Sequence, residues 1–97
     1  MAKQEQTQTI YKTIYIGRKP MREYLVACLT ALGSGNNRLV LKARGEAINT
    51  LVDTSEVLKR QNPLVQVDSI IIGTEVLEDS QSHRKRNVST MEIIVSI

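Results

Sequence analysis

The hydrophobic pattern near the start of the chain predicts a β-strand. Residues 10–16 alternate isoleucine with tyrosine and threonine. Such a run of β-branched and aromatic residues is typical of a strand, because successive side chains point to opposite faces of a sheet. A short basic loop follows at residues 17–20. Within it, Pro20 is suited to the first turn of a helix, because its missing N–H would have no partner there.

Two later stretches carry apolar residues at intervals of three and four, the spacing of one helical face. The first spans residues 21–32 and ends at the Gly-Ser-Gly-Asn run 33–36, since glycine readily adopts the positive φ of a helix cap. The second spans residues 48–60 and ends before Pro63, which does not fit inside a helix. On this second helix we expect Val57 to lie opposite the apolar stripe and to be exposed.

The last third of the chain predicts a long hairpin. Residues 65–77 and 88–97 are strand-like, and the intervening residues 78–87 include no apolar side chain. The hairpin tip is therefore polar and basic. In its first strand the run Ile70–Ile72 places apolar groups on both faces, so one face needs more cover than the predicted helices supply.

One further strand completes the fold prediction. Residues 38–44 contain a short aliphatic run closed by Gly45, so a strand, a helix and a strand follow one another as in a right-handed crossover. The order β-α-β-α-β-β predicts an α/β (α+β) two-layer sandwich. Its four-stranded mixed sheet would carry two helices on one face and a protruding hairpin. We expect residues 9–97 to form this single domain and residues 1–8 to form a flexible tail.

Composition limits the chemistry that the chain can perform. The 97 residues are 41% hydrophobic and 24% charged, as in one ordinary small globular domain. Cys28 is the only cysteine and His83 the only histidine, which excludes an internal disulfide and the ligand set of a structural zinc site. His83 falls in the predicted hairpin tip and Cys28 on an apolar helix stripe, so neither is expected to act as a base or nucleophile. We predict no enzyme activity, no metal and no cofactor.

The same pattern bears on the location of the protein. No apolar run approaches the length of a membrane span. The N-terminus leads into polar glutamine and threonine rather than the apolar stretch of a signal peptide. We therefore expect a soluble cytoplasmic protein with no membrane partner.

Positive charge gathers in patches along the chain. The net charge is +3, but the first fifty residues carry eight basic against three acidic side chains. Two patches follow strands and begin helices, where the helix dipole and free N–H groups favour an anion. The third lies in the hairpin tip, as expected of a basic arm that follows a nucleic-acid groove. The candidate nucleic-acid-binding residues are Arg18, Lys19, Arg22, Lys42, Arg44, Arg84, Lys85 and Arg86.

Simpler interpretations exist for each of these features. A single basic residue on a surface is usually only solvated, and a charged tip keeps a hairpin soluble. Phosphate binding by the basic residues as a group is favoured because the two loops are expected to converge where the two helices begin. The tyrosines could stack bases, but the shared strand face of Tyr11 and Tyr15 and the helix stripe of Tyr24 indicate packing instead.

Several runs of the sequence resemble the Alba family of archaeal chromatin proteins. The runs are Ile16-Gly17-Arg18-Lys19-Pro20, Leu41-Lys42-Ala43-Arg44-Gly45-Glu46-Ala47-Ile48, Val52-Asp53-Thr54, Gly73 and Arg86-Asn87-Val88-Ser89-Thr90-Met91-Glu92-Ile93. The resemblance implies a compact α/β domain that forms a homodimer, whose two hairpins reach along a duplex. It also implies binding to DNA and RNA with little sequence preference. The residues that match the family's binding positions are Arg18, Lys19, Arg44, Arg84 and Arg86.

Three positions depart from the pattern of the family. Arg18 stands where members commonly have a lysine that is regulated by acetylation, so that switch is not expected here. Glu46 stands where many members have a basic residue, which removes a phosphate contact and adds repulsion. The pair Asn62-Pro63 stands where the family often has an exposed aromatic residue that joins neighbouring dimers. Filament formation along DNA is therefore less expected for this chain.

The sequence thus predicts a non-enzymatic protein that binds double-stranded DNA and RNA, associated with the chromosome or nucleoid. A homodimer is expected, with a heterodimer with a paralogue as the alternative. One alternative function is a dedicated RNA-binding subunit of a ribonucleoprotein. Another is a protein-interaction domain that uses the run Ile70–Ile72 together with Val57 and whose basic residues only confer solubility.

Overall fold

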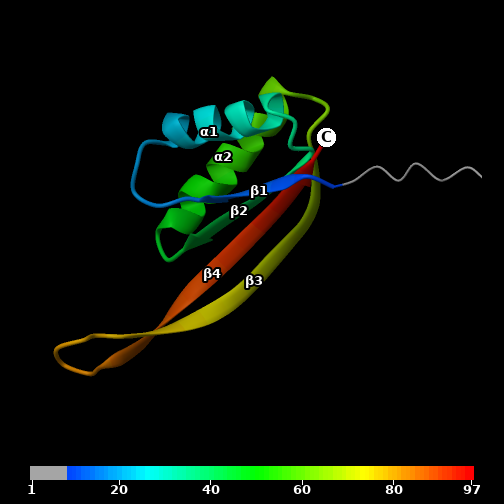
Figure 1. Ribbon diagram of the computed structural model, residues 1–97. Coiled ribbons are helices and arrows are strands. Elements are labelled where there is room, and N and C mark those ends of the chain that lie inside the picture. Colours follow the sequence, from blue (N-terminus) through cyan, green and yellow to red (C-terminus); the bar gives the residue numbers. More distant parts are fainter. Residues whose placement is uncertain (1–8) are drawn as a thin grey trace, which may run out of the picture.

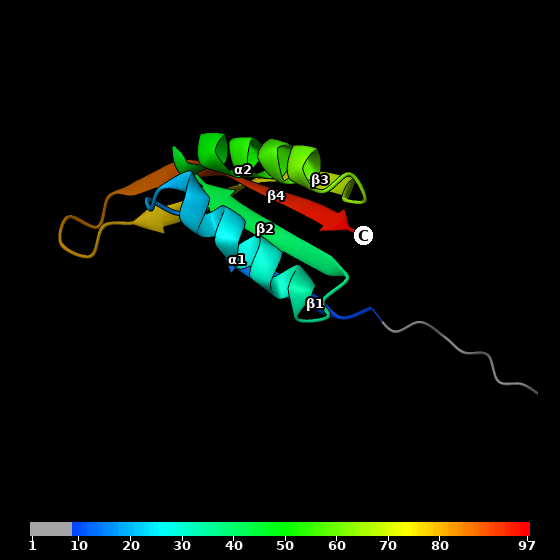
Figure 2. The ribbon, with the colours of Figure 1, turned by 90° about the horizontal axis from the view of Figure 1, so that it is seen from above.

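The computed structural model describes residues 9–97 and contains the predicted elements in the predicted order. Their bounds are β1 Tyr11–Tyr15, α1 Met21–Gly33, β2 Arg38–Arg44, α2 Ala47–Gln61, β3 Gln66–Glu78 and β4 Lys85–Ser96. The four strands form one sheet, and both helices lie on the same face of it (Figure 1, Figure 2). The predicted flexible tail, residues 1–8, lies outside the described residues.

The sheet is mixed, with the strand order β1-β2-β4-β3. Strands β1 and β2 are parallel, whereas β4 runs antiparallel to both β2 and β3. The predicted two-layer α+β architecture is therefore confirmed. Because β1 and β2 are parallel, both end at the same edge of the sheet, and the loops that lead into α1 and α2 both begin there.

The core lies between the helices and the inward face of the sheet. Every second residue of β2 points inward, and Leu39 and Leu41 are completely buried. They pack in one cluster with Cys28 of α1. The apolar stripe that the spacing predicts for α1 includes Tyr24, Leu25 and Cys28, which are buried, and Leu29, which is instead 41% exposed. Ala31, two residues further along α1, is buried in the core cluster.

The buried face of α2 differs from the predicted one. Val57 is half-buried and packs against the core instead of lying exposed. Thr54, which the predicted stripe left out, is buried beside Ser55, and their hydroxyls donate to the carbonyl oxygens of Thr50 and Leu51 at 2.7 and 2.9 Å. Because these hydroxyls are satisfied within the helix, they can face the core, and the face shifts towards Val57.

The hairpin of β3 and β4 extends beyond the rest of the sheet. Strand β2 ends at Arg44, which pairs with Thr90, so the part of β4 before Thr90 pairs with β3 alone. Residues 74–78 and 85–89 therefore form a two-stranded arm, which projects past the body that the helices cover (Figure 1). Near its start, β3 contains an irregularity between Val67 and Ser69.

The interpretation of two tyrosines as packing residues was wrong. Tyr11 and Tyr15 are 62% and 72% exposed. Ile14 is buried beneath the helices, so its odd-numbered neighbours in β1 point to the opposite, uncovered face of the sheet. Tyr24 is buried in α1, as expected.

Candidate nucleic-acid interface

A buried tyrosine fixes the loop between β1 and α1. The hydroxyl of Tyr24 accepts hydrogen bonds from the backbone N–H groups of Gly17 at 2.8 Å and of Lys19 at 3.0 Å. Just before the loop, the N–H of Ile16 donates to the carbonyl oxygen of Lys42 at 2.8 Å. The loop backbone is thus anchored at both ends, while the side chains of Arg18 and Lys19 remain exposed.

A glycine shapes the loop between β2 and α2. Gly45 has φ +61°, a left-handed conformation that side chains other than glycine rarely adopt. Its N–H donates to the carbonyl oxygen of Ser89 in β4 at 2.9 Å, and its carbonyl oxygen accepts from the N–H of Ile48 at 3.1 Å. These bonds tie the loop to the hairpin on one side and to α2 on the other. Arg44 therefore emerges next to the base of the hairpin arm.

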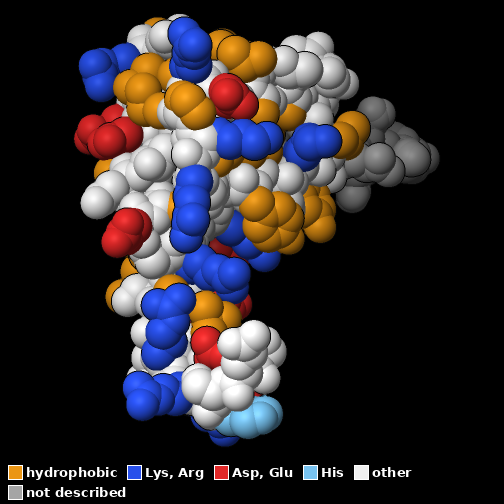
Figure 3. Space-filling view, turned by 90° about the vertical axis from the view of Figure 1, so that its left-hand side faces the viewer, with side chains coloured by type: hydrophobic (Ala, Val, Ile, Leu, Met, Phe, Trp, Pro, Cys, Tyr) orange, Lys and Arg blue, Asp and Glu red, His pale blue; other side chains and the backbone are white. Residues whose placement is uncertain are grey.

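Both loops and the hairpin arm border one groove, the loop groove. The groove has a volume of about 690 Å³, and its lining includes four basic side chains and one acidic one. These charged residues are Arg18, Lys19, Arg44, Glu46 and Arg86. They come from three segments that are far apart in the sequence. In Figure 3, Lys and Arg side chains follow one another from the body of the molecule down to the end of the hairpin.

Lys42 does not lie in this groove, contrary to the expectation that it would converge with the other loop residues. Its neighbours Leu41 and Ala43 are buried beneath the helices, so Lys42 points to the uncovered face of the sheet. There its Nζ lies 3.8 Å from Oε2 of Glu92 and 5.9 Å from the ring centroid of Tyr15. Lys42 thus belongs to a different surface.

The charge of Arg44 is partly compensated within the protein. Its Nη1 donates to Oε1 of Glu75 in β3 at 2.7 Å. Both side chains are about half exposed, so water screens the pair and a competing anion can reach the guanidinium. Glu75 could not be predicted as a partner of Arg44, because the two residues are 31 positions apart and lie on strands β2 and β3, on either side of β4.

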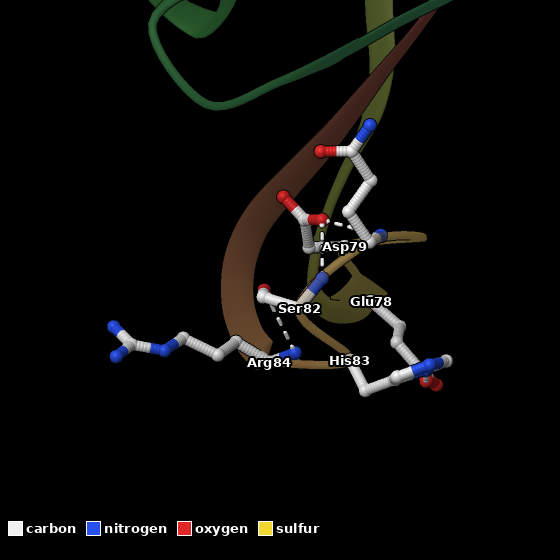
Figure 4. A network of polar contacts seen from close by, with 6 residues as sticks. Glu78, Asp79, Ser82, His83 and Arg84 are labelled. Atoms are coloured by element: carbon white, nitrogen blue, oxygen red, sulfur yellow. Dashed lines mark hydrogen bonds and ion pairs between the residues drawn. The ribbon is translucent and has the colours of Figure 1, made fainter.

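The hairpin tip has its own network of hydrogen bonds (Figure 4). The carboxylate of Asp79 accepts from the N–H groups of Gln81 at 2.7 Å and Ser82 at 3.0 Å. These backbone hydrogen bonds, that of Ser82 first, lower the pKa of Asp79 below its ordinary value of 3.8, although desolvation opposes them. His83 takes a positive φ of 60° and lies 3.3 Å from Glu78. The tip is a closed turn in which the carboxylate holds the backbone.

The remaining predicted site residues lie along the arm and on α1. Arg84, Lys85 and Arg86 are exposed and border a second groove at the tip, of about 650 Å³. Because Arg86 borders both grooves, the basic surface of the loops continues along the arm. Arg22 is exposed in the first turn of α1 but does not line the loop groove.

Alternative chemistry finds little support in residues 9–97. No group of histidine, cysteine or carboxylate side chains in this part of the chain is arranged to hold a metal ion. Burial raises the pKa of the Cys28 thiol to about 11, so the reactive thiolate is scarce at neutral pH. Neither α1 nor α2 is long and apolar enough to span a membrane.

Comparisons with known proteins agree on one family. The family model described as Alba matches residues 12–74. The chain is 40% identical over 85 residues to DNA/RNA-binding protein Alba 1 of Archaeoglobus fulgidus, which covers 87% of this chain and 93% of that protein. It is also 40% identical over 83 residues to DNA/RNA-binding protein Alba of Methanocella arvoryzae, covering 84% of this chain and 85% of the relative.

A solved structure agrees with these sequence matches. Alba from Thermoplasma volcanium superimposes with a TM-score of 0.82 at 31% identity, covering 89% of this chain and all of that one (100%). The family match extends over both basic loops and most of β3. The chain is therefore a member of the Alba family.

Proposed function

We propose that this protein binds double-stranded DNA and RNA through their phosphate backbones, with little preference for sequence. The observation that carries the proposal is the groove in which Arg18, Lys19, Arg44 and Arg86 meet from three distant segments. Four cations facing one acidic residue form a surface complementary to a polyanion. The names of the archaeal relatives as DNA/RNA-binding proteins support the same assignment.

The mechanism is neutralisation of phosphates by basic side chains. Each Lys or Arg that contacts a phosphate displaces a condensed counterion, and the released ions drive association. Such contacts orient the protein on the nucleic acid but carry no sequence information. The protein is accordingly a packaging or coating component associated with the chromosome or with RNA, and it performs this role without enzymatic activity.

We further propose that two chains pair through the apolar surface of β3. Ile70 and Ile72 are 57% and 74% exposed. They pair with Ile93 and Met91 of β4, and Ile93 is buried on the helix-covered side, so both isoleucines extend the core surface beyond the cover of the helices. Leu64, before β3, is also exposed. A second copy would cover this surface and add a second basic arm to the assembly.

A pair of charge-matched double variants tests the proposed function. Arg18→Ala/Lys19→Ala removes two cations from the groove, whereas Lys59→Ala/Arg60→Ala removes two cations from the last turn of α2, outside the groove. Binding to a short DNA duplex and to a short RNA duplex is measured by fluorescence anisotropy. We expect only the first variant to weaken binding strongly, for both duplexes. Equal losses in the two variants would reject a localised site.

A further inference from the structure

A second surface with binding chemistry lies on the face of the sheet that no helix covers. Tyr11 and Tyr15 point to this face from the edge strand β1 and are largely exposed. The register pairs each tyrosine with a cation of β2, Tyr11 with Arg38 and Tyr15 with Lys42. The surface therefore repeats one unit, an open aromatic ring beside a basic side chain.

The spacing of the two units suits an extended ligand. Tyr11 and Tyr15 are four residues apart in one strand, which places them about 13 Å from each other along the sheet. Between them only Thr13, which is half-buried, points to the same face from β1. Two rings at this distance cannot enclose one small planar group. They can each contact a separate group of a chain that runs along β1.

Arg38 and Lys42 each have an acidic partner but remain available to bind a phosphate. Arg38 lies 3.8 Å from Asp68, and Lys42 lies 3.8 Å from Glu92. Both pairs are long and partly exposed, and exposed ion pairs contribute little free energy, so a phosphate can displace the carboxylates. The rings are also accessible: Tyr15 stays 72% exposed even with the Lys42 ammonium 5.9 Å from its centroid.

We propose that Tyr11, Tyr15, Arg38 and Lys42 form a platform that binds single-stranded nucleic acid, with bases stacked on the tyrosines and phosphates near the cations. Base stacking on aromatic side chains next to basic groups is a general mode of single-strand binding. A duplex does not fit this chemistry, because its bases are already stacked on one another. The platform is therefore distinct from the proposed duplex interface.

The two surfaces are continuous at Arg44. Arg44 borders the loop groove and also a shallow groove of about 630 Å³ on the open face, which Tyr15 and Lys42 line as well. A single strand that leaves a duplex held in the loop groove can thus pass Arg44 and reach Tyr15. Nucleic acids with a junction between paired and unpaired segments would engage both surfaces at once.

Replacement of both rings tests the platform. In Tyr11→Ile/Tyr15→Ile the strand propensity is kept and the stacking surface is lost, whereas Tyr11→Phe/Tyr15→Phe keeps the ring. Affinities are measured for labelled oligouridine, labelled oligothymidine and a DNA duplex. We expect the isoleucine variant to lose about tenfold in single-strand affinity per ring, and the phenylalanine variant to bind like the parent. Loss for oligouridine alone assigns the platform to RNA, and loss for both probes assigns it to single strands in general.

Three results would overturn the platform. They are an unchanged single-strand affinity in the isoleucine variant, an equal loss of duplex affinity, or a change in oligomeric state, which would identify the tyrosines as a contact between copies of the chain. The Arg18→Ala/Lys19→Ala variant separates this inference from the proposed function. Undiminished duplex binding in that variant would reject the loop interface. The platform is tested by the tyrosine variants alone.

Discussion

The hydroxyl of Tyr24, buried on the sheet side of α1, accepts a hydrogen bond from the backbone N–H of Lys19 at 3.0 Å. The same hydroxyl accepts from Gly17, so one side chain of the core fixes the backbone of the loop that presents Arg18. A buried side chain of the core therefore positions the loop that carries the proposed phosphate contacts.

The variant Tyr24→Phe removes this acceptor while keeping the ring. Two loop N–H groups lose their partner, which should lower the free energy of unfolding by about 1–2 kcal/mol. Because the loop then samples more conformations, duplex affinity should fall severalfold. Thermal unfolding and anisotropy titration measure the two effects. A variant that is destabilised but binds duplex as tightly as the parent would show that the loop needs no such anchor.

The ion pair between Arg44 and Glu75 predicts a gain of affinity. In Glu75→Gln the guanidinium loses its charged partner at 2.7 Å and becomes free to contact phosphate. We expect duplex binding about two- to fivefold tighter, which corresponds to the free energy of an exposed ion pair. Glu56→Gln makes the same charge change on an exposed part of α2. If both variants gain equally, net charge alone explains the effect and release of Arg44 does not.

The hairpin tip should respond to acid at Asp79. Hydrogen bonds from Ser82 and Gln81 lower the pKa of this carboxyl in the folded state. Their contribution is therefore present above the ordinary value of 3.8 and is lost as pH falls through the lower folded value. Amide NMR resonances of Ser82 and Gln81 should titrate with a midpoint below 3.8, and in Asp79→Asn this titration should disappear. A midpoint at or above 3.8 would contradict the hydrogen-bonded turn at Asp79.

The exposed isoleucines of β3 predict a defined oligomeric state. A charge at Ile72, which is 74% exposed, should be tolerated by a monomer but not inside an apolar dimer interface. We expect Ile72→Glu to elute as a folded monomer in size-exclusion chromatography with light scattering, while Val26→Glu, on the outer surface of α1, stays dimeric. A parent chain that is monomeric at micromolar concentration would reject the pairing surface.

Much of the fold could be predicted from local pattern. The alternation in residues 10–16 and the three- and four-residue spacing in residues 21–32 define β1 and α1, because those periods follow directly from backbone geometry. The buried position of Val57 in α2 was not predicted, since hydrophobicity alone does not show that Thr54 can satisfy its hydroxyl on its own helix and face the core.

The candidate site was predictable where charge sits in loops, and less so within strands. The proximity of Arg18 and Arg44 could be predicted, because parallel strands end at one edge of a sheet. Lys42 was assigned to the wrong surface, because a shift of one residue in a strand changes the face. The exposure of Tyr11 and Tyr15 could not be predicted, because it depends on which face of the sheet the helices cover.

The salt dependence of duplex binding tests the central claim most directly, namely that basic side chains from two loops and one arm neutralise phosphates. With three to five phosphates neutralised per protomer, the logarithm of the affinity should fall with the logarithm of salt concentration at a slope of about −3 to −5 per protomer. In Arg18→Ala/Lys19→Ala the slope should be shallower by about two. A slope near zero for the parent protein would contradict the proposed mechanism.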